Sequence, residues 1–263
     1  MARKGVGRKP QWRTVLRAIL AIAVAAPILS YPAQAADPNA LWHVVHDLCV
    51  PDERTTGRPA PCSRVDIAGG YAVLKDIRGS TQLLVVPTER LSGIEDPQLL
   101  RPGPPNYWQD AWDARDLFEK RAGRPVPRQD LGLAVNSIDG RSQNQLHIHI
   151  DCVRADVRDA LAARAGRFGA AWSRPMFLAG QRYRVMRLSG AELGNRDPFK
   201  LLASGDRRAR ASMGLETLAV IGATLPDGRP GFFLLADRAN LVRFDIGAAE
   251  QLLDHDCAVL RPR

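Results

Sequence analysis

The sequence predicts an α+β fold, and three observations support that prediction. Polar and apolar side chains alternate strictly over residues 145–151, which is the period of a half-buried β-strand. Two other apolar runs, at 71–76 and 82–87, are joined by an Arg-Gly-Ser turn and are typical of paired strands. Between these runs and the alternating one, residues 107–122 carry apolar side chains at helical spacing. Strands and helices are therefore mixed along one chain of ordinary globular composition.

Residues 1–35 are expected to be a targeting segment rather than part of the fold. A basic stretch precedes an apolar run from Ala18 to Leu29, and small residues close the segment at Ala33 and Ala35. The run has twelve residues, which is short for a membrane span of about 20. We expect export with cleavage after Ala35, and an uncleaved membrane anchor at 18–29 is the alternative. Residues 36–263 are then one domain.

The charge of the chain does not indicate a nucleic-acid-binding protein. The formal net charge is +9, but six of the cations lie in residues 1–35, which contain no acidic residue. The rest of the chain has 31 basic and 28 acidic residues, a net charge of +3. The basicity is therefore mainly a targeting feature, and no nucleic-acid partner is expected. The small remaining excess suits an anionic lipid surface or a diphosphate substrate.

The first half of the exported chain is expected to begin with a helix. Residues 41–48 are amphipathic, with Trp42, Val45 and Leu48 on one side, and a loop rich in proline and charge follows at 51–61. After the hairpin described above, prolines at 102–105 break the chain before Asn106. The later elements expected here are a helix at 107–122, strands at 131–137 and 145–153, and a helix at 154–167.

The second half is β-rich without repeating the sequence of the first. A Pro-Asp-Gly-Arg-Pro stretch at 226–230 predicts a hairpin turn. This half contains no histidine pair and no glycine-rich phosphate loop, so we expect it to extend the sheet and wall the site. A degenerate duplicate of the first half is the alternative. The expected elements are strands at 182–188, 217–224, 231–236 and 242–246, and short helices at 198–204 and 248–254.

The alternating run places two histidines side by side. Gln145, His147, His149 and Asp151 point to one face of the strand, so the imidazoles are about 7 Å apart at their Cα atoms. One imidazole of such a pair can attack phosphorus while the other stabilises charge or transfers a proton. A structural pair and half of a metal site are the alternatives. The loop at 136–144 is rich in hydrogen-bond donors and favours phosphate, although Asp151 and Cys152 keep metal binding open.

Four cysteines in an exported chain predict two disulfides, and three pairings are possible. Cys49 and Cys62 flank a short loop, which favours a local bridge between them. Cys152 would then pair with Cys257 and tie the C-terminal tail to the histidine strand. Free buried cysteines are the alternative. A catalytic thiol is disfavoured because alternation places Cys152 on the face opposite the histidines.

The ordered set of motifs resembles the bacterial CDP-diacylglycerol pyrophosphatases, a membrane-associated branch of the histidine triad (HIT-like) superfamily. The similarity covers residues 48–260 and is most specific in Ser142–Cys152. It also includes the hairpin at 70–88, the stretch at 105–116, Met213-Gly214 and Asp254–Cys257. The resemblance implies a HIT-like antiparallel sheet flanked by helices. It further implies hydrolysis of CDP-diacylglycerol to CMP and phosphatidate at the periplasmic side of the inner membrane, beside its lipid surface.

The resemblance also assigns roles to individual residues. His147 matches the middle triad histidine, which forms a nucleotidyl-histidine intermediate, and His149 matches the third. Gln145 stands where the wider superfamily has the first histidine; an amide can orient the nucleophile but cannot titrate. No metal or cofactor is implied. The substrate-binding candidates are Asn136 for the phosphates or the ribose, Ser142 and Gln143 for the phosphates, and Asp76 for the ribose. Lys75 and Arg141 are candidates for neutralising the diphosphate, with a solvated surface position as the alternative for both.

Some alternatives stay open at this point. Trp108 and Trp112 could line an acyl or cytosine pocket, although their helical spacing is more typical of core residues. A solvated turn residue is an equally good interpretation of Asp76. The activity itself has two rivals: a nucleotidyl hydrolase or transferase acting on a soluble nucleotide, and a non-catalytic exported protein that binds metal or nucleotide through His147 and His149.

Overall fold

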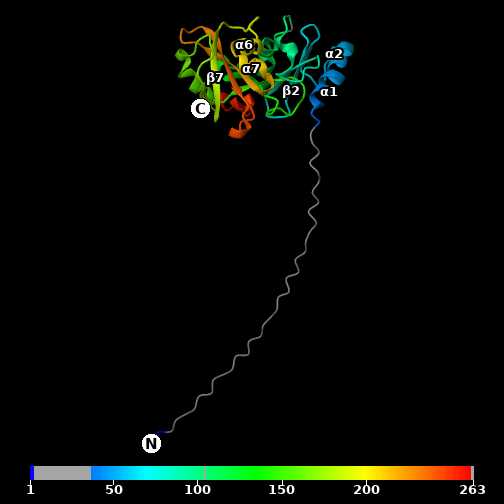
Figure 1. Cartoon of the computed structure of the whole chain (residues 1–263). Helices are drawn as coiled ribbons and strands as arrows, with labels where there is room; N and C mark the ends of the chain where they lie inside the picture. Colours follow the sequence, from blue (N-terminus) through cyan, green and yellow to red (C-terminus); the bar gives the residue numbers. More distant parts are fainter. Residues whose placement is uncertain (3–36, 104, 262–263) are drawn as a thin grey trace. The chain divides into compact units, whose positions relative to one another are not determined.

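The fold is built on one antiparallel sheet of ten strands (Figure 1). This computed structural model describes residues 1–2, 37–103 and 105–261. The strand order is β1-β2-β3-β5-β4-β8-β9-β7-β6, and β10 pairs with the end of β5. The α+β prediction is confirmed. The strands are β1 (Arg64–Asp66), β2 (Tyr71–Lys75), β3 (Leu83–Pro87), β4 (Leu131–Val135), β5 (Ile148–Val153), β6 (Met176–Leu178), β7 (Gln181–Ser189), β8 (Glu216–Thr224), β9 (Pro230–Arg238) and β10 (Leu253–Asp254).

Helices cover one face of the sheet and form the largest core. They bury Trp108, Trp112 and Phe118 against the strands, together with apolar residues on one face of β5 such as Ile148 and Ile150. The expected helix at 107–122 is divided at Ala114 into two. The helices of this layer are α3 (Tyr107–Asp113), α4 (Arg115–Ala122), α6 (Pro198–Gly205) and α7 (Arg207–Ala211).

The opposite face of the sheet has two smaller cores with a gap between them. One core contains Val157 and Leu161 of α5 (Ala155–Ala162), packed against β4, β8 and β9. The other packs the N-terminal helix against β2 and β3. His149 pairs in register with Leu84 of one core and Ala134 of the other. The histidine face of β5 therefore opens between the two cores.

The N-terminal helix differs from its prediction in phase and length. It comprises α1 (Ala40–His43), a π-helical turn at Val44–Cys49 and α2 (Val50–Thr56). The helix therefore continues into residues 51–56, which were expected to be part of a loop at 51–61. Leu41, Val45 and Cys49 are buried, whereas Leu48 is exposed. Because the π-helical turn is wider than an α-helical turn, the buried residues recur every four positions instead of every three.

The second half also differs from its prediction in several places. Residues 242–246 are not a strand; they form an exposed loop that starts with a 3₁₀ turn at Leu241–Arg243. Residues 248–254 form a 3₁₀ turn at Ala249–Leu252 followed by β10, not an α-helix. The sequence prediction also missed β1, β6 and α7, which are all five residues or shorter. Further 3₁₀ turns lie at Pro97–Leu100, Arg128–Asp130, Ala165–Arg167, Met213–Leu215 and Ala258–Leu260.

Two disulfides connect distant parts of this framework. Cys49 pairs with Cys62, and Cys152 pairs with Cys257. The predicted pairings are therefore present in the structure. The second bridge joins β5 to the C-terminal tail, 105 residues later. The expected targeting segment at 1–35 lies outside the described residues apart from its first two.

Candidate active site

His147 and His149 lie at the wall of a cavity of about 290 Å³. His147 immediately precedes β5 and His149 lies within it. Their ring centroids are 4.9 Å apart with planes at 74°, so the edge of one ring meets the face of the other. We call this hollow the active-site cavity. Its apolar wall is Ala40, Leu41, Val44, Leu74, Ile77 and Leu84, and its polar wall is Lys75, Asp76, Arg78, Asn136, Gly140, Arg141, Ser142, Gln143, His147, His149 and Glu250.

His147 is oriented by a main-chain carbonyl. Its Nδ1 lies 2.7 Å from the backbone oxygen of Gln145, so Nδ1 donates its proton and the lone pair is on Nε2. Burial and the neighbouring His149 lower the pKa of His147 to about 4. The imidazole is therefore neutral at physiological pH, with an unprotonated ring nitrogen available for attack.

His149 lies between two carboxylates. Gln82 Nε2 is 2.9 Å from His149 Nδ1, and the Asp76 carboxylate is 3.7 Å from the same nitrogen. His149 Nε2 faces Glu250 at 3.6 Å. Donation from Gln82 to Nδ1 selects the tautomer with the proton on Nε2. The two carboxylates therefore lie at different nitrogens of the ring.

Glu250 organises the polar wall of the cavity. Burial alone would raise its pKa, but hydrogen bonding to His255, the charge of His149 and donors from Asn136 and Gln82 hold the pKa far below its usual range. Asn136 binds Glu250 twice, donating to its carboxylate at 3.1 Å and accepting from its backbone N–H at 3.1 Å. Asp76 behaves similarly, because His149 and the backbone of Arg78 lower its pKa despite burial.

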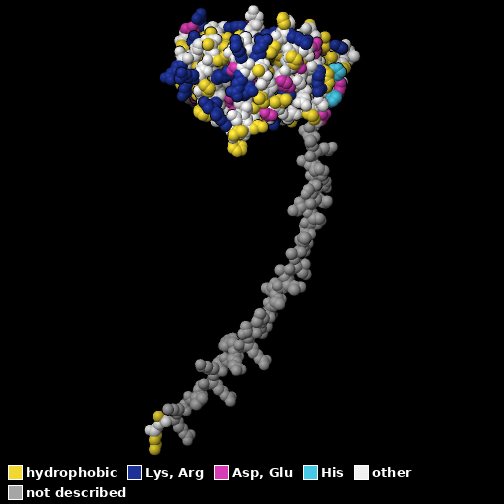
Figure 2. All heavy atoms as spheres, in the orientation of Figure 1, with side chains coloured by type: hydrophobic (Ala, Val, Ile, Leu, Met, Phe, Trp, Pro, Cys, Tyr) yellow, Lys and Arg dark blue, Asp and Glu magenta, His cyan; other side chains and the backbone are white. Residues whose placement is uncertain are grey.

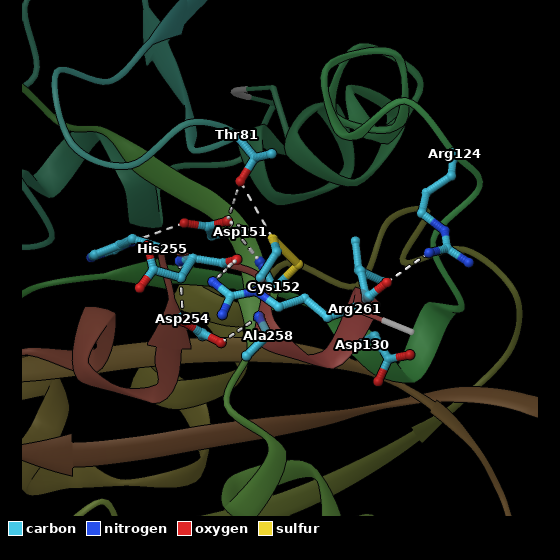
Figure 3. The surroundings of a disulfide bond; sticks show 12 residues. Thr81, Arg124, Asp130, Asp151, Cys152, Asp254, His255, Ala258 and Arg261 are labelled. Carbon is cyan, nitrogen blue, oxygen red and sulfur yellow. Dashed lines mark hydrogen bonds and ion pairs between the residues drawn. A yellow bond between two sulfur atoms is a disulfide. The ribbon is translucent and has the colours of Figure 1, made fainter. Parts of the chain in front are cut away.

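A second charged layer supports these residues from behind. His255 Nδ1 lies 2.8 Å from Asp151, and its Nε2 lies 3.4 Å from Glu250. The two carboxylates raise the pKa of His255 to about 10, so the ring is an imidazolium. Figure 3 shows Asp151 between Thr81 and His255, beside the disulfide of Cys152. Asp151 thus points to the histidine face, as alternation predicts.

The predicted phosphate-binding loop is only partly free to bind a ligand. Ser142 is exposed at the cavity, and its side chain makes no hydrogen bond within the described residues. Gln143 accepts from the Leu41 backbone N–H at 2.8 Å and fastens α1 to the cavity. Arg141 forms a bidentate ion pair with Glu95, with distances of 2.6 and 2.7 Å. Its charge is therefore already matched by the protein.

Lys75 and Gln145 also have protein partners. Lys75 Nζ donates to the turn carbonyls of Asp76, Arg78 and Gly79. The Gln145 side chain is buried and donates to the carbonyls of Pro87 and Glu89, away from the cavity lining. The orienting contact to His147 thus comes from the main chain of Gln145, not from the amide expected to supply it. The Arg78 side chain is mostly exposed at the cavity and makes a 3.4 Å ion pair with Glu250.

The cavity contains one group of potential metal ligands. Atoms of Asp76, His149 and Glu250 lie within 4.8 Å of one another, which would suit a divalent ion. The carboxylates approach different nitrogens of His149, however, so the group is arranged around the ring rather than around a shared centre. The metal-ligand alternative for Cys152 is not supported, because its sulfur is in a disulfide.

Comparison with known proteins identifies the family. Residues 36–261 match the sequence profile of the CDP-diacylglycerol pyrophosphatases. A CDP-diacylglycerol pyrophosphatase from Yersinia pestis is 41% identical over 256 residues, which cover 97% of this chain and 98% of the relative. The chain belongs to the CDP-diacylglycerol pyrophosphatase family. It is therefore a hydrolase, and its similarity to the family extends well beyond the histidine motif.

Sequence reasoning missed several residues that this CDP-diacylglycerol pyrophosphatase family member places at the cavity or in contact with its histidines. Gln82 begins an apolar strand, and a polar residue at that buried position was the only signal for it. Glu250 and Arg78 had no distinctive spacing. Trp108 and Trp112 are core residues with almost no exposed surface, so they line no substrate pocket. Within the described ranges, no helix is both long and apolar enough to span a bilayer.

Proposed function

We propose that this chain hydrolyses the diphosphate bond of CDP-diacylglycerol to CMP and phosphatidate through a cytidylyl-His147 intermediate. The observation that carries the proposal is the state of His147: Nδ1 is held by a carbonyl, and a lowered pKa leaves the ring neutral at the cavity wall. The family name supports the substrate, because relatives are called CDP-diacylglycerol pyrophosphatases.

In the first step, His147 Nε2 attacks the phosphorus attached to cytidine. A P–N bond forms, the P–O bond to the bridging oxygen breaks, and phosphatidate leaves with the bonding electron pair. His149 is placed to stabilise the negative charge that develops on the leaving oxygen, because its ring lies beside His147 at the cavity wall and carries an Nε2–H. Arg78 and Ser142 are the polar groups at the cavity best placed to bind the phosphate oxygens.

In the second step, water attacks the same phosphorus and the P–N bond breaks. The electron pair of the P–N bond returns to His147 Nε2, so His147 is released neutral, and the proton of the attacking water passes to solvent as CMP is formed. Asn136 and Asp76 are proposed to bind the nucleotide, and Lys75, Arg141 and Gln143 to maintain the shape of the cavity through their protein partners.

The proposal includes a HIT-like arrangement in which Gln145 replaces the first histidine. Its backbone carbonyl supplies the hydrogen bond that fixes the His147 tautomer, so the substitution leaves the nucleophile oriented. Export to the periplasmic side of the inner membrane is part of the proposal, with cleavage after Ala35 or anchoring by residues 18–29. The two disulfides support an oxidising compartment.

Trapping of the intermediate tests this proposal. Acid quenching is avoided because phosphoramidates are acid-labile; the enzyme is denatured in alkali during turnover of CDP-diacylglycerol labelled at the cytidylyl phosphorus. Label should attach to the peptide containing His147 and be absent from His147→Ala. CMP release without any labelled protein would favour direct attack by water. Release of no CMP, with turnover of a soluble dinucleotide instead, would favour the rival substrate class.

A further inference from the structure

The segment after β9 forms a short loop that presents apolar side chains to solvent. Val242 is 91% exposed, Phe244 is 92% exposed, and Leu241 and Ile246 beside them are exposed as well. These four are among the nine most exposed large apolar side chains in the body of the described chain. This loop is orange in Figure 1, at the lower edge of the body, and Figure 2 shows apolar atoms at its tip. Such a cluster marks a binding surface.

The loop has a defined conformation that directs these side chains outward. Asn240 and Asp245 exchange two backbone hydrogen bonds of 2.7 and 3.2 Å, which close its base. Asp245 is buried and accepts from the Gly247 N–H at 2.8 Å. Phe244 has a φ of 57°, in the left-handed region that disfavours bulky residues. A strained aromatic residue that remains fully exposed indicates a role outside the fold.

The base of the loop is attached to the wall of the active-site cavity. Ser137 donates its backbone N–H to Gly247 at 2.8 Å and its hydroxyl to Ile246 at 2.5 Å. Gly140, which lines the cavity, lies so close that a Cβ would be 2.9 Å from the Ile246 carbonyl oxygen. On another part of the cavity wall, Ile77 is 99% exposed. Exposed apolar residues therefore occur at two places beside the cavity.

Positive charge lies within the loop and in the hollow beside it. Arg243 lies within it, and Arg182 and Arg208 line the adjoining surface hollow; all three are exposed and form no ion pair within the described residues. The acidic side chains of the same hollow are matched or buried, with Asp206 and Glu216 paired to arginines and Asp237 and Asp245 buried. An apolar tip with unpaired arginines within it and beside it complements an anionic lipid surface.

We infer that the loop Leu241–Ile246 inserts into the surface of an anionic bilayer and holds the active-site cavity against it. The inference rests on the proposed function, whose substrate is a membrane lipid. A cavity of about 290 Å³ is at the lower limit for drug-sized ligands, so it suits the nucleotide head group but not two acyl chains. The acyl chains then stay in the bilayer while the diphosphate reaches His147.

A local probe tests insertion directly. All four native cysteines are in disulfides, so Val242→Cys provides a single thiol for an environment-sensitive fluorophore. Full-length protein should show a blue-shifted, brighter signal with vesicles of phosphatidylcholine and phosphatidylglycerol. Thr224→Cys, exposed at the opposite end of β8, is the matched control and should not respond. The readout reports on the loop whatever residues 1–35 do. No response at Val242, or equal responses at both positions, would overturn the inference.

Activity measurements separate this inference from the proposed function. The double variant Val242→Ser/Phe244→Ser should hydrolyse long-chain CDP-diacylglycerol in vesicles roughly 100-fold more slowly, about tenfold for each lost apolar side chain. It should hydrolyse a soluble short-chain CDP-diacylglycerol at the wild-type rate. Wild-type protein that is inactive on both substrates refutes the proposed function, while the fluorophore still tests docking. Unchanged vesicle activity of the double variant refutes docking.

The charge of Arg243 and self-association of the chain provide two further tests. Arg243→Gln should weaken binding to anionic vesicles about fivefold and leave binding to neutral vesicles unchanged. Equal weakening with both lipids would contradict the charge argument. This test does not depend on whether the double variant folds. A wild-type dimer that forms without lipid and is dissociated by Arg243→Gln or by the double variant, with no fluorophore response to vesicles, would identify a second copy of the chain as the occupant.

Discussion

Lowering the pH from 7 to 5 should leave the covalent step of the proposed reaction almost unchanged. Burial and the neighbouring His149 lower the pKa of His147 to about 4, against an ordinary value of 6.5. Roughly nine tenths of His147 is then neutral at pH 5, whereas a histidine of ordinary pKa would be only about 3% neutral. The structure therefore predicts a covalent step about 30-fold faster at pH 5 than an unperturbed histidine would allow.

Single-turnover measurements between pH 4 and pH 8 test this prediction. The rate of label transfer from CDP-diacylglycerol to protein should decline only near pH 4. Ring ¹⁵N chemical shifts provide a direct control, with the His147 signal assigned by its loss in His147→Gln. A ring that titrates near 6.5 would refute the argument from burial, whatever the kinetics show.

The same pKa has a consequence for folding. The pKa of His147 is lower in the folded than in the unfolded state, so the unfolded chain binds more protons between pH 6.5 and pH 4, and stability falls as pH falls through this range. The loss should approach ~3 kcal/mol at pH 4. Urea unfolding at pH 7 and at pH 4.5 should show a smaller pH dependence in His147→Gln than in the wild type; identical slopes would contradict the reasoning.

Three further outcomes are expected. His147→Ala should lose several powers of ten in activity, and a folded variant with more than about a tenth of wild-type activity would exclude His147 as nucleophile; His149→Ala should lose roughly 10²–10⁴-fold but still form detectable intermediate. Raising the pH towards 10 should weaken the fold, because Asp151 and Glu250 raise the pKa of His255 to about 10. The stability that His255 contributes is complete below its unfolded pKa and is lost as the pH approaches 10. In urea unfolding, the stability of His255→Gln should lack this dependence on pH. Strong reductant should lower activity and stability, with loop-entropy contributions of about 3 kcal/mol for Cys49–Cys62 and about 5 kcal/mol for Cys152–Cys257, and free thiols or a Cys62–Cys152 link in non-reducing peptide maps would contradict this framework.

Alternation along one strand predicted the geometry at the histidines. Because side chains in a strand alternate between faces, Asp151 lies with the histidines and Cys152 lies in the opposite core, as the sequence indicates. The same rule fails at Gln145, which precedes β5 and does not continue its geometry. Its side chain therefore leaves the cavity, and only its carbonyl reaches His147.

Contacts between distant segments could not be derived from local patterns. Glu250 reaches His149 because the 3₁₀ turn at Ala249–Leu252 packs beside β4, and nothing in the spacing of residues 248–254 encodes that packing. Periodicity also misled at 242–246. Apolar alternation predicts burial, but it does not distinguish a protein core from another apolar environment, and these residues are in a solvent-facing loop.

The position of the tail contacts affects when the enzyme becomes active. Glu250 and His255 belong to the last fourteen residues, and Cys257 ties this tail to β5. A nascent chain therefore carries its nucleophile more than a hundred residues before the groups that complete its surroundings. We expect competence to appear only after residues 250–257 have been made and the sulfurs of Cys152 and Cys257 have been oxidised. A chain made only as far as its histidines is then expected to be inactive.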